Sequence, residues 1–341
     1  MAITIPLKAD VEFGVVPTHI KFVGGLAPDE NGLLPRAGDG RVAVVAEMAA
    51  LMEASPVKID SAQITLFPGV APEDTEAMIT GLKDLGLEVH LIMMVGGADP
   101  MNPEDEDAVV AMLVDGLKIA QRYGIKQVAS TSIEEWMKPG ALPKEGADFE
   151  AAVAQDVRAH TRAVREAGLG EGDIEHWHIE FLRGGEFQTF TDVAKAWAFV
   201  KAANAEMGRT FFKIMIDAAH CGDSPLGIAE NEKLIAEVAA AGEMGMFHAS
   251  AKTTRGCLST DDGWIGALLA AAAKTGKLEY VFVEIFHHED PALQGLRDLD
   301  PGHGIDTTDG RSYREAVIDG AVSVTRRLNN LAARGMLGAK S

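Results

Sequence analysis

Eight short apolar segments, each followed by a stretch with helical periodicity, constrain the fold of this chain more than any other feature. The segments are rich in Val, Ile, Phe and Met and span residues 11–16, 62–67, 88–95, 126–131, 175–182, 210–217, 244–250 and 280–286. The stretches between them carry Ala, Leu, Glu and Lys at helical spacing, and several end in Gly, as helices often do. Strands that alternate with helices pair in parallel, and eight such units close into a barrel. The sequence therefore predicts an α/β fold, a (β/α)8 TIM barrel, with an open doubly wound sheet as the competing arrangement.

The length of the chain agrees with one barrel domain. At 341 residues it is longer than an ordinary domain, but α/β barrels reach this size around a single core. We expect one domain over residues 1–341, with a long loop at about 24–40 after the first strand and a C-terminal helix at about 311–335.

The charge balance and the cysteine content exclude several classes of partner. Lys and Arg number 31 against 51 Asp and Glu, which gives a net charge of −20 and repels nucleic acid and anionic membranes. No apolar run approaches the length of a membrane span, and the N-terminus lacks the basic and apolar pattern of an export signal. The only two cysteines, Cys221 and Cys257, cannot form a disulfide framework or a Cys-rich zinc module. We therefore expect a cytoplasmic protein.

Side chains that can bind a metal end four of the predicted strands: Glu180, Asp217, His248 and Glu284. In a parallel barrel the C-terminal strand ends meet at one mouth, and side-chain alternation points these carboxylates into it. Three carboxylates that converge without a counter-charge repel one another, whereas a divalent cation removes this repulsion. Oxygen ligands with one imidazole suit Mn²⁺, Mg²⁺, Co²⁺ or Zn²⁺, and the ligand set does not choose sharply among them. The sequence therefore predicts a site for one divalent metal ion.

These residues resemble a known family. Glu180, the motif DAAH at 217–220, His248 followed by Arg255, and VEIF with Glu284 resemble the ketose 3-epimerase branch of the xylose isomerase-like TIM barrels. The resemblance implies that the four strand-end side chains bind one divalent metal. It also implies that Glu180 and Glu284 are the catalytic acid/base pair.

The resemblance extends to residues expected to contact the substrate. Glu186 lies six positions after the strand-5 glutamate, and His220 lies three after the strand-6 aspartate, as in the family. Arg255 lies seven positions after the strand-7 histidine, where the family has six. Lys252 stands in the same loop and adds a second cation to it.

Three functions are compatible with such a site. The first is a metal-dependent sugar isomerase or epimerase that works through a metal-stabilised enediolate, with a small carbohydrate as substrate. The second is a metal-dependent lyase, a decarboxylase or dehydratase of a 3-oxo sugar acid or a polyol, because Lys252, Arg255 and Arg183 favour an anionic substituent. The third is a non-catalytic sugar-binding module, although such a module would not need both Glu180 and Glu284.

Other features of the sequence have weaker implications. Relatives in this family are often dimers or tetramers, so the resemblance allows a homo-oligomer. His176 and His178 are interpreted as core imidazoles of a polar barrel interior, with satisfied hydrogen bonds. The pattern assigns no role to four further histidines: His19, His90, His287 and His288.

Overall fold

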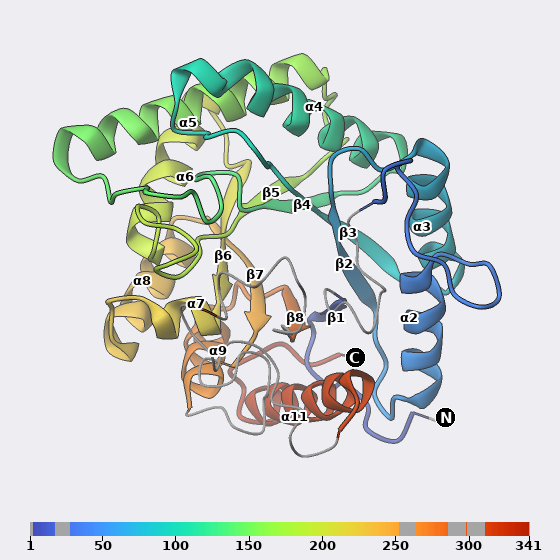
Figure 1. The fold of residues 1–341 in the computed structure, drawn as a ribbon. Coiled ribbons are helices and arrows are strands. Elements are labelled where there is room, and N and C mark those ends of the chain that lie inside the picture. The colour runs from blue at the N-terminus through green and yellow to red at the C-terminus, as the bar shows by residue number, and fades with distance from the viewer. Residues whose placement is uncertain (1–2, 18–27, 252–262, 286–297, 299–310, 341) are drawn as a thin grey trace.

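The eight strands form one closed parallel barrel in the computed structural model of the protein, which describes residues 3–17, 28–251, 263–285, 298 and 311–340 (Figure 1). Each strand pairs with the next along the chain, and β1 pairs with β8 to close the barrel. The prediction of a single-domain TIM barrel is therefore confirmed, and the open doubly wound sheet is wrong.

The strands lie within a few residues of the apolar segments in the sequence. Their bounds are β1 Glu12–Val16, β2 Ser61–Leu66, β3 Glu88–Met93, β4 Gln127–Ser130, β5 His176–Ile179, β6 Phe212–Asp217, β7 Met244–Ala249 and β8 Tyr280–Glu284. The ladder between β6 and β7 is interrupted by a register shift between Ile214 and Ile216.

The helices lie outside the barrel, as Figure 1 shows. Their bounds are α2 Ala43–Ala54, α3 Pro72–Asp84, η1 Pro103–Asp105, α4 Glu106–Arg122, α5 Gly146–Ala167, α6 Val193–Met207, α7 Ala218–Asp223, α8 Ile228–Ala240, α9 Trp264–Lys274 and α11 Tyr313–Ala333. Local sequence explains several ends: Ser312 and Glu315 form a capping box at the start of α11, and Gly208 ends α6 in a left-handed conformation. Within the described residues, no helix combines the length and apolar character needed to cross a membrane.

Two apolar layers support the barrel. The larger layer packs the outward side chains of the strands against the helices. The smaller one fills the barrel interior with Val16, Ile92, Ala129, Met215, Met246 and Phe282. Gly14 makes room for this inner layer, because a Cβ at that position would lie 2.4 Å from the Phe282 ring and 2.4 Å from Oγ of Ser61. Three members of this inner layer, Met215, Met246 and Phe282, each lie two positions before a polar residue near the end of the same strand.

Candidate metal centre

Four buried side chains meet at the C-terminal end of the barrel. Asp217 and Glu284 are the last residues of β6 and β8, His248 is the penultimate residue of β7, and Glu180 directly follows β5. Each offers one ligand atom, and these four atoms all lie within 4.8 Å of one another. The exposed fraction is 5% for Glu180, 3% for Glu284 and 0% for the other two. The structure therefore brings together the residues that the sequence selected as a metal site.

The main chain sets the positions of these side chains. Asp217 and His248 are opposite each other in the β6–β7 register, and Glu284 is opposite Val16 in the β1–β8 register. Asp217 also begins α7, because its Oδ1 accepts a hydrogen bond of 2.6 Å from the backbone N–H of His220. The N-cap contact fixes the rotation of the carboxylate and leaves Oδ2 directed toward Nδ1 of His248, at 3.9 Å.

The imidazole of His248 is the centre of the cluster. Its Nδ1 lies 3.0 Å from Oε2 of Glu284 and 3.4 Å from Oε1 of Glu180. Burial by itself would lower the pKa of His248, but the negative charges of Glu284 and Glu180 raise it well above its ordinary value. Burial raises the pKa of Glu180, and the contact with His248 only partly offsets that effect. The cluster therefore carries an excess of negative charge that calls for a positive counter-charge.

A divalent cation fits this donor set. Three carboxylates and one imidazole nitrogen converge from separate strands in a buried space, and such groups are the usual ligands of hard or intermediate divalent metals. The other ring nitrogen of His248, Nε2, lies 2.7 Å from Oε1 of Gln63 and so points away from the cluster. The chemistry of the four groups does not select a particular metal.

Two of the predicted substrate contacts lie beside the cluster. Nε2 of His220 is 3.7 Å from Oε1 of Glu180. Glu186 is buried, and its carboxylate lies 3.3 Å from Nε1 of Trp136 and 3.3 Å from Nε of Arg183. The other two, Lys252 and Arg255, lie outside the described residues, as do His19, His287 and His288.

Arg183, which the sequence placed among the cations near the site, is held between two carboxylates. Besides its contact with Glu186, its Nη1 lies 3.6 Å from Oδ2 of Asp223 in α7. The side chain is buried, so these acidic groups offset its charge in a region of low dielectric. Within the described residues, Arg183 therefore pairs with the carboxylates of Glu186 and Asp223.

Two of the histidines that the structure describes away from the cluster, His178 and His90, have side-chain or backbone partners. Nε2 of His178 lies 2.9 Å from Oε1 of Gln127, and its Nδ1 accepts from the backbone N–H of Met246 at 3.3 Å. Nε2 of His90 lies 2.6 Å from Oε1 of Glu12. The interpretation of His178 as a satisfied core imidazole agrees with these contacts. For His176 it does not, because the side chain is only partly buried and its Nδ1 has no hydrogen-bond partner among the described residues.

Two residues were not marked by any sequence pattern: Gln63, which contacts His248 of the cluster, and Trp136, which contacts Glu186. Gln63 is a glutamine in the middle of an apolar strand, and Trp136 stands in a loop of no recognisable motif. Only the closed barrel brings Gln63 of β2 against His248 of β7, since these strands are not neighbours in the sheet. Alternation shows that Gln63 faces inward, but it does not identify the contact.

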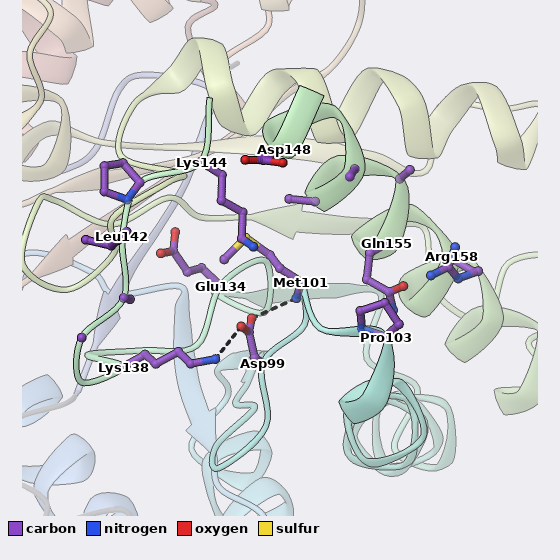
Figure 2. A pocket seen from close by; sticks show the side chains of 16 residues that line it. Asp99, Met101, Pro103, Glu134, Lys138, Leu142, Lys144, Asp148, Gln155 and Arg158 are labelled. Carbon is purple, nitrogen blue, oxygen red and sulfur yellow. Dashed lines mark hydrogen bonds and ion pairs between the residues drawn. The ribbon is translucent and has the colours of Figure 1, made fainter. Parts of the chain in front are cut away.

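A cavity of about 790 Å³ lies apart from the metal cluster. Figure 2 shows it between the loops that follow β3 and β4 and the first half of α5. On one side Oδ2 of Asp99 pairs with Nζ of Lys138 at 2.7 Å, and Oδ1 accepts from the backbone N–H of Met101 at 3.0 Å (Figure 2). Its lining carries both acidic and basic side chains, including Glu134 and Lys144.

The fold and the cluster together define a class of protein: parallel (β/α)8 barrels with a buried site of three carboxylates and one imidazole at the mouth. No model of a known protein family matches this chain, and no curated protein matches its sequence. Among solved structures it is similar to D-allulose 3-epimerase from Methylomonas sp., with a TM-score of 0.69, 16% identity, and coverage of 96% of this chain and 100% of that one.

Two further structures show the same likeness. An L-ribulose 3-epimerase aligns with a TM-score of 0.69 and 16% identity over 95% of this chain and 97% of its own. A xylose isomerase domain protein from Planctomyces limnophilus aligns with a TM-score of 0.52 and 14% identity over 89% and 96%. The chain therefore shares the fold of the ketose 3-epimerases and of xylose isomerase-like proteins, as the sequence motifs implied.

Proposed function

We propose that this protein is a divalent-metal-dependent isomerase or epimerase that acts on a small, neutral ketose. The observation that carries the proposal is the convergence of Glu180 and Glu284. They come from β5 and β8, which are not neighbours in the barrel, yet an oxygen of each approaches the same atom, Nδ1 of His248. Two buried carboxylates that reach one point from different sides of the mouth suit a reaction in which a proton leaves one face of a carbon and returns to the other.

The two glutamates divide the proton transfers between them. One carboxylate removes the proton from the carbon next to the substrate carbonyl, and the electron pair of the C–H bond moves into an enediolate. The other glutamate, in its acid form, delivers a proton to the opposite face of the same carbon, and the two exchange roles in the reverse reaction. Acid–base groups of this kind contribute about 10²- to 10⁴-fold each. A divalent cation bound by the four side chains would supply Lewis-acid polarisation of the substrate oxygens.

Neighbouring residues hold the sugar in place. His220 lies beside Glu180, and Glu186 is oriented by Trp136 and Arg183. Both can therefore form hydrogen bonds with substrate hydroxyls next to the reacting carbon. Since Glu186 and Asp223 offset the charge of Arg183, the described part of the mouth favours a neutral hydroxyl-rich substrate over a sugar acid or sugar phosphate.

The solved structures support the same substrate class. Two of them are named as a D-allulose 3-epimerase and an L-ribulose 3-epimerase, and both names describe epimerisation of a ketose at C3. The shared feature is a polyhydroxy ketone with a hydroxyl-bearing carbon next to the carbonyl. We therefore infer that this chain epimerises a ketose at that carbon.

The test uses purified protein loaded with Mn²⁺ and a panel of D-allulose, L-ribulose, other free ketoses, ketose phosphates and 3-oxo sugar acids. We expect a C3 epimer of at least one free ketose, with one deuterium incorporated at C3 in D₂O, and no turnover after treatment with a chelator. Release of CO₂ from a sugar acid without ketose epimerisation would favour the lyase. Binding of ketoses with no turnover and no deuterium incorporation would favour a non-catalytic module.

A further inference from the structure

The outer ring nitrogen of His248 is held by a glutamine from the far side of the barrel. Its Nε2 lies 2.7 Å from Oε1 of Gln63. An amide oxygen only accepts hydrogen bonds, so Nε2 must carry the proton in this contact. Without a cation, Nδ1 shares a proton with the carboxylates of Glu284 and Glu180 that it faces. When a cation takes the place of that proton, an imidazole that keeps its proton at Nε2 presents its lone pair at Nδ1. The contact with Gln63 therefore selects which nitrogen is directed at the cluster.

A methionine sulfur fixes the orientation of the Gln63 amide. Nε2 of Gln63 lies 3.3 Å from Sδ of Met246. A thioether sulfur can accept a hydrogen bond but cannot donate one. If the amide rotated by half a turn, its oxygen would face the sulfur and its NH₂ group would face the N–H of His248, so both contacts would be lost. Met246 therefore directs the amide oxygen of Gln63 toward His248.

These three side chains are shielded from solvent and cross the barrel. Gln63 and His248 each have an exposed fraction of 0%, and Met246 belongs to the buried inner layer. Gln63 stands on β2 and His248 on β7, so the contact joins strands that share no main-chain ladder. Breaking a buried hydrogen bond leaves its donor and acceptor without partners, which costs free energy. The contact therefore restricts the orientation of the imidazole.

A second glutamine–histidine pair in the same barrel provides a comparison. Oε1 of Gln127 lies 2.9 Å from Nε2 of His178, which matches the contact between Gln63 and His248. In that pair, however, Nδ1 of the histidine already accepts from the backbone N–H of Met246. Both ring nitrogens of His178 therefore have protein partners, and neither can bind a metal. Gln127 accordingly has a structural role in the barrel interior.

We propose that Gln63 and Met246 are positioning residues of the metal site: Gln63 holds His248 in the tautomer that coordinates through Nδ1, and Met246 holds Gln63 in the orientation that allows this. The inference rests on the proposed function, because it assigns a role toward the same cation. Partners that hold the second nitrogen of a metal-bound histidine typically change metal affinity by about 10- to 100-fold.

The test measures metal binding directly rather than catalysis. Metal-free protein is titrated with Mn²⁺, and the unbound ion is counted by electron paramagnetic resonance, for the wild type and for Gln63→Leu, Gln63→Glu, Met246→Leu and Gln127→Leu. We expect Gln63→Leu to weaken Mn²⁺ binding by about 10- to 100-fold, and Gln63→Glu, which keeps an acceptor oxygen, to recover most of that loss. Met246→Leu should weaken binding by less than about 10-fold, and the matched control Gln127→Leu by less than about 3-fold.

A spectroscopic readout separates positioning from general destabilisation. With ¹¹³Cd²⁺ bound and histidine labelled with ¹⁵N, the wild type should show cadmium coupling to Nδ1 of His248 and a proton on Nε2. Met246→Leu keeps the volume of the side chain, and in this variant the Nε2 proton should exchange faster with solvent. Thermal unfolding of each variant shows whether it remains folded.

Two outcomes would overturn the inference, and they are distinguishable from each other. In the first outcome, wild-type protein binds Mn²⁺, and Gln63→Leu binds it as tightly as the wild type or loses no more affinity than the control Gln127→Leu. Gln63 then has no positioning role, although the metal site itself is confirmed. If the wild type binds no Mn²⁺ or Cd²⁺, the metal-dependent function fails as well.

Discussion

Asp217 at the end of β6 lies directly opposite His248 of β7, and its Oδ2 is 3.9 Å from Nδ1 of that histidine. The other oxygen of the same carboxylate caps α7 by accepting from the N–H of His220. One aspartate therefore belongs to the candidate metal centre, starts a helix, and holds the backbone of the proposed substrate contact His220. Groups placed on strand ends and held by main-chain contacts are positioned more precisely than groups on loops, which is the arrangement that catalytic sites need.

Removing either acid/base group should abolish turnover. Glu180→Gln and Glu284→Gln each keep an oxygen that can bind a metal but remove the group that exchanges a proton. We expect the rate of ketose epimerisation to fall by at least about 10²-fold in each variant. Glu243→Gln is the control, since Glu243 is equally buried but hydrogen-bonds to Trp197 and Asn204, away from the mouth. A rate within about threefold of wild type in either test variant would contradict the assigned roles.

The inner layer of the barrel should not tolerate a side chain at Gly14. A Cβ there would lie 2.4 Å from the Phe282 ring, and that ring is fully buried. We expect Gly14→Ala to lower the free energy of unfolding by about 1–3 kcal/mol, measured by chemical denaturation. Gly38→Ala is the control, because its Cβ would meet no atom within 4 Å, and its effect should stay within about 0.5 kcal/mol. Equal stability of the two variants would show that Phe282 can move aside.

A buried histidine makes the protein sensitive to acid. His160 in α5 accepts from Ser132 at Nε2 and donates to the backbone oxygen of Asp156 from Nδ1, and burial lowers its pKa to about 4. The pKa of His160 is lower in the folded protein than in the unfolded chain. The contribution of neutral His160 to the free energy of unfolding is therefore complete above pH ~6.5 and is lost as the pH falls toward 4. The full loss amounts to roughly 3 kcal/mol.

Comparison with His160→Gln isolates this contribution. Unfolding free energies measured between pH 7.5 and 4.5 should fall more steeply for the wild type than for the variant. Parallel curves for the two proteins would show that His160 does not titrate in this range.

The neighbouring Asp156 should destabilise the protein at neutral pH. Its side chain is fully buried, and neither carboxylate oxygen has a hydrogen-bond partner among the residues that the structure describes. Burial, with the charges of Asp99 and Glu134, raises its pKa well above the ordinary value. The folded protein favours the protonated form of Asp156. Its full contribution to the free energy of unfolding is present only below the pKa of the unfolded chain, and this contribution is lost as the pH rises.

Asp156→Asn should therefore raise the free energy of unfolding at pH 7 by at least about 1 kcal/mol, since one pKa unit corresponds to about 1.4 kcal/mol. The gain should disappear near pH 4. Asp115→Asn, an exposed aspartate of α4, is the control and should change stability by less than about 0.5 kcal/mol. A loss of stability at pH 7 in Asp156→Asn would show that the carboxylate is stabilised in the folded protein.

The fold could be predicted because its signals are local and repeated. Each strand is an apolar run of ordinary length, and each long helix has its own helical spacing of apolar residues. An error of a few residues in the predicted end of a strand or helix therefore does not change the predicted topology. The helix α7 gave no such signal, since its six residues are too few to show a period. It is specified instead by Asp217, whose carboxylate serves as its N-cap.

The site could be predicted in part for a related reason. A carboxylate or imidazole that ends an apolar strand is visible in the sequence, and the barrel rule brings such groups together. The contacts that orient them are not visible in this way. Gln63 meets His248 across the barrel, and Arg183 meets Asp223 from α7, so both contacts depend on tertiary structure and have no fixed spacing in the chain.

The most direct test of the proposed metal centre is the location of a bound ion in crystals of the protein soaked in Mn²⁺, read from the anomalous scattering of manganese. We expect one strong peak, about 2.0–2.3 Å from an oxygen of each of Glu180, Asp217 and Glu284 and from Nδ1 of His248. No peak at this position, or a peak bound by other residues while these four side chains remain together, would contradict it.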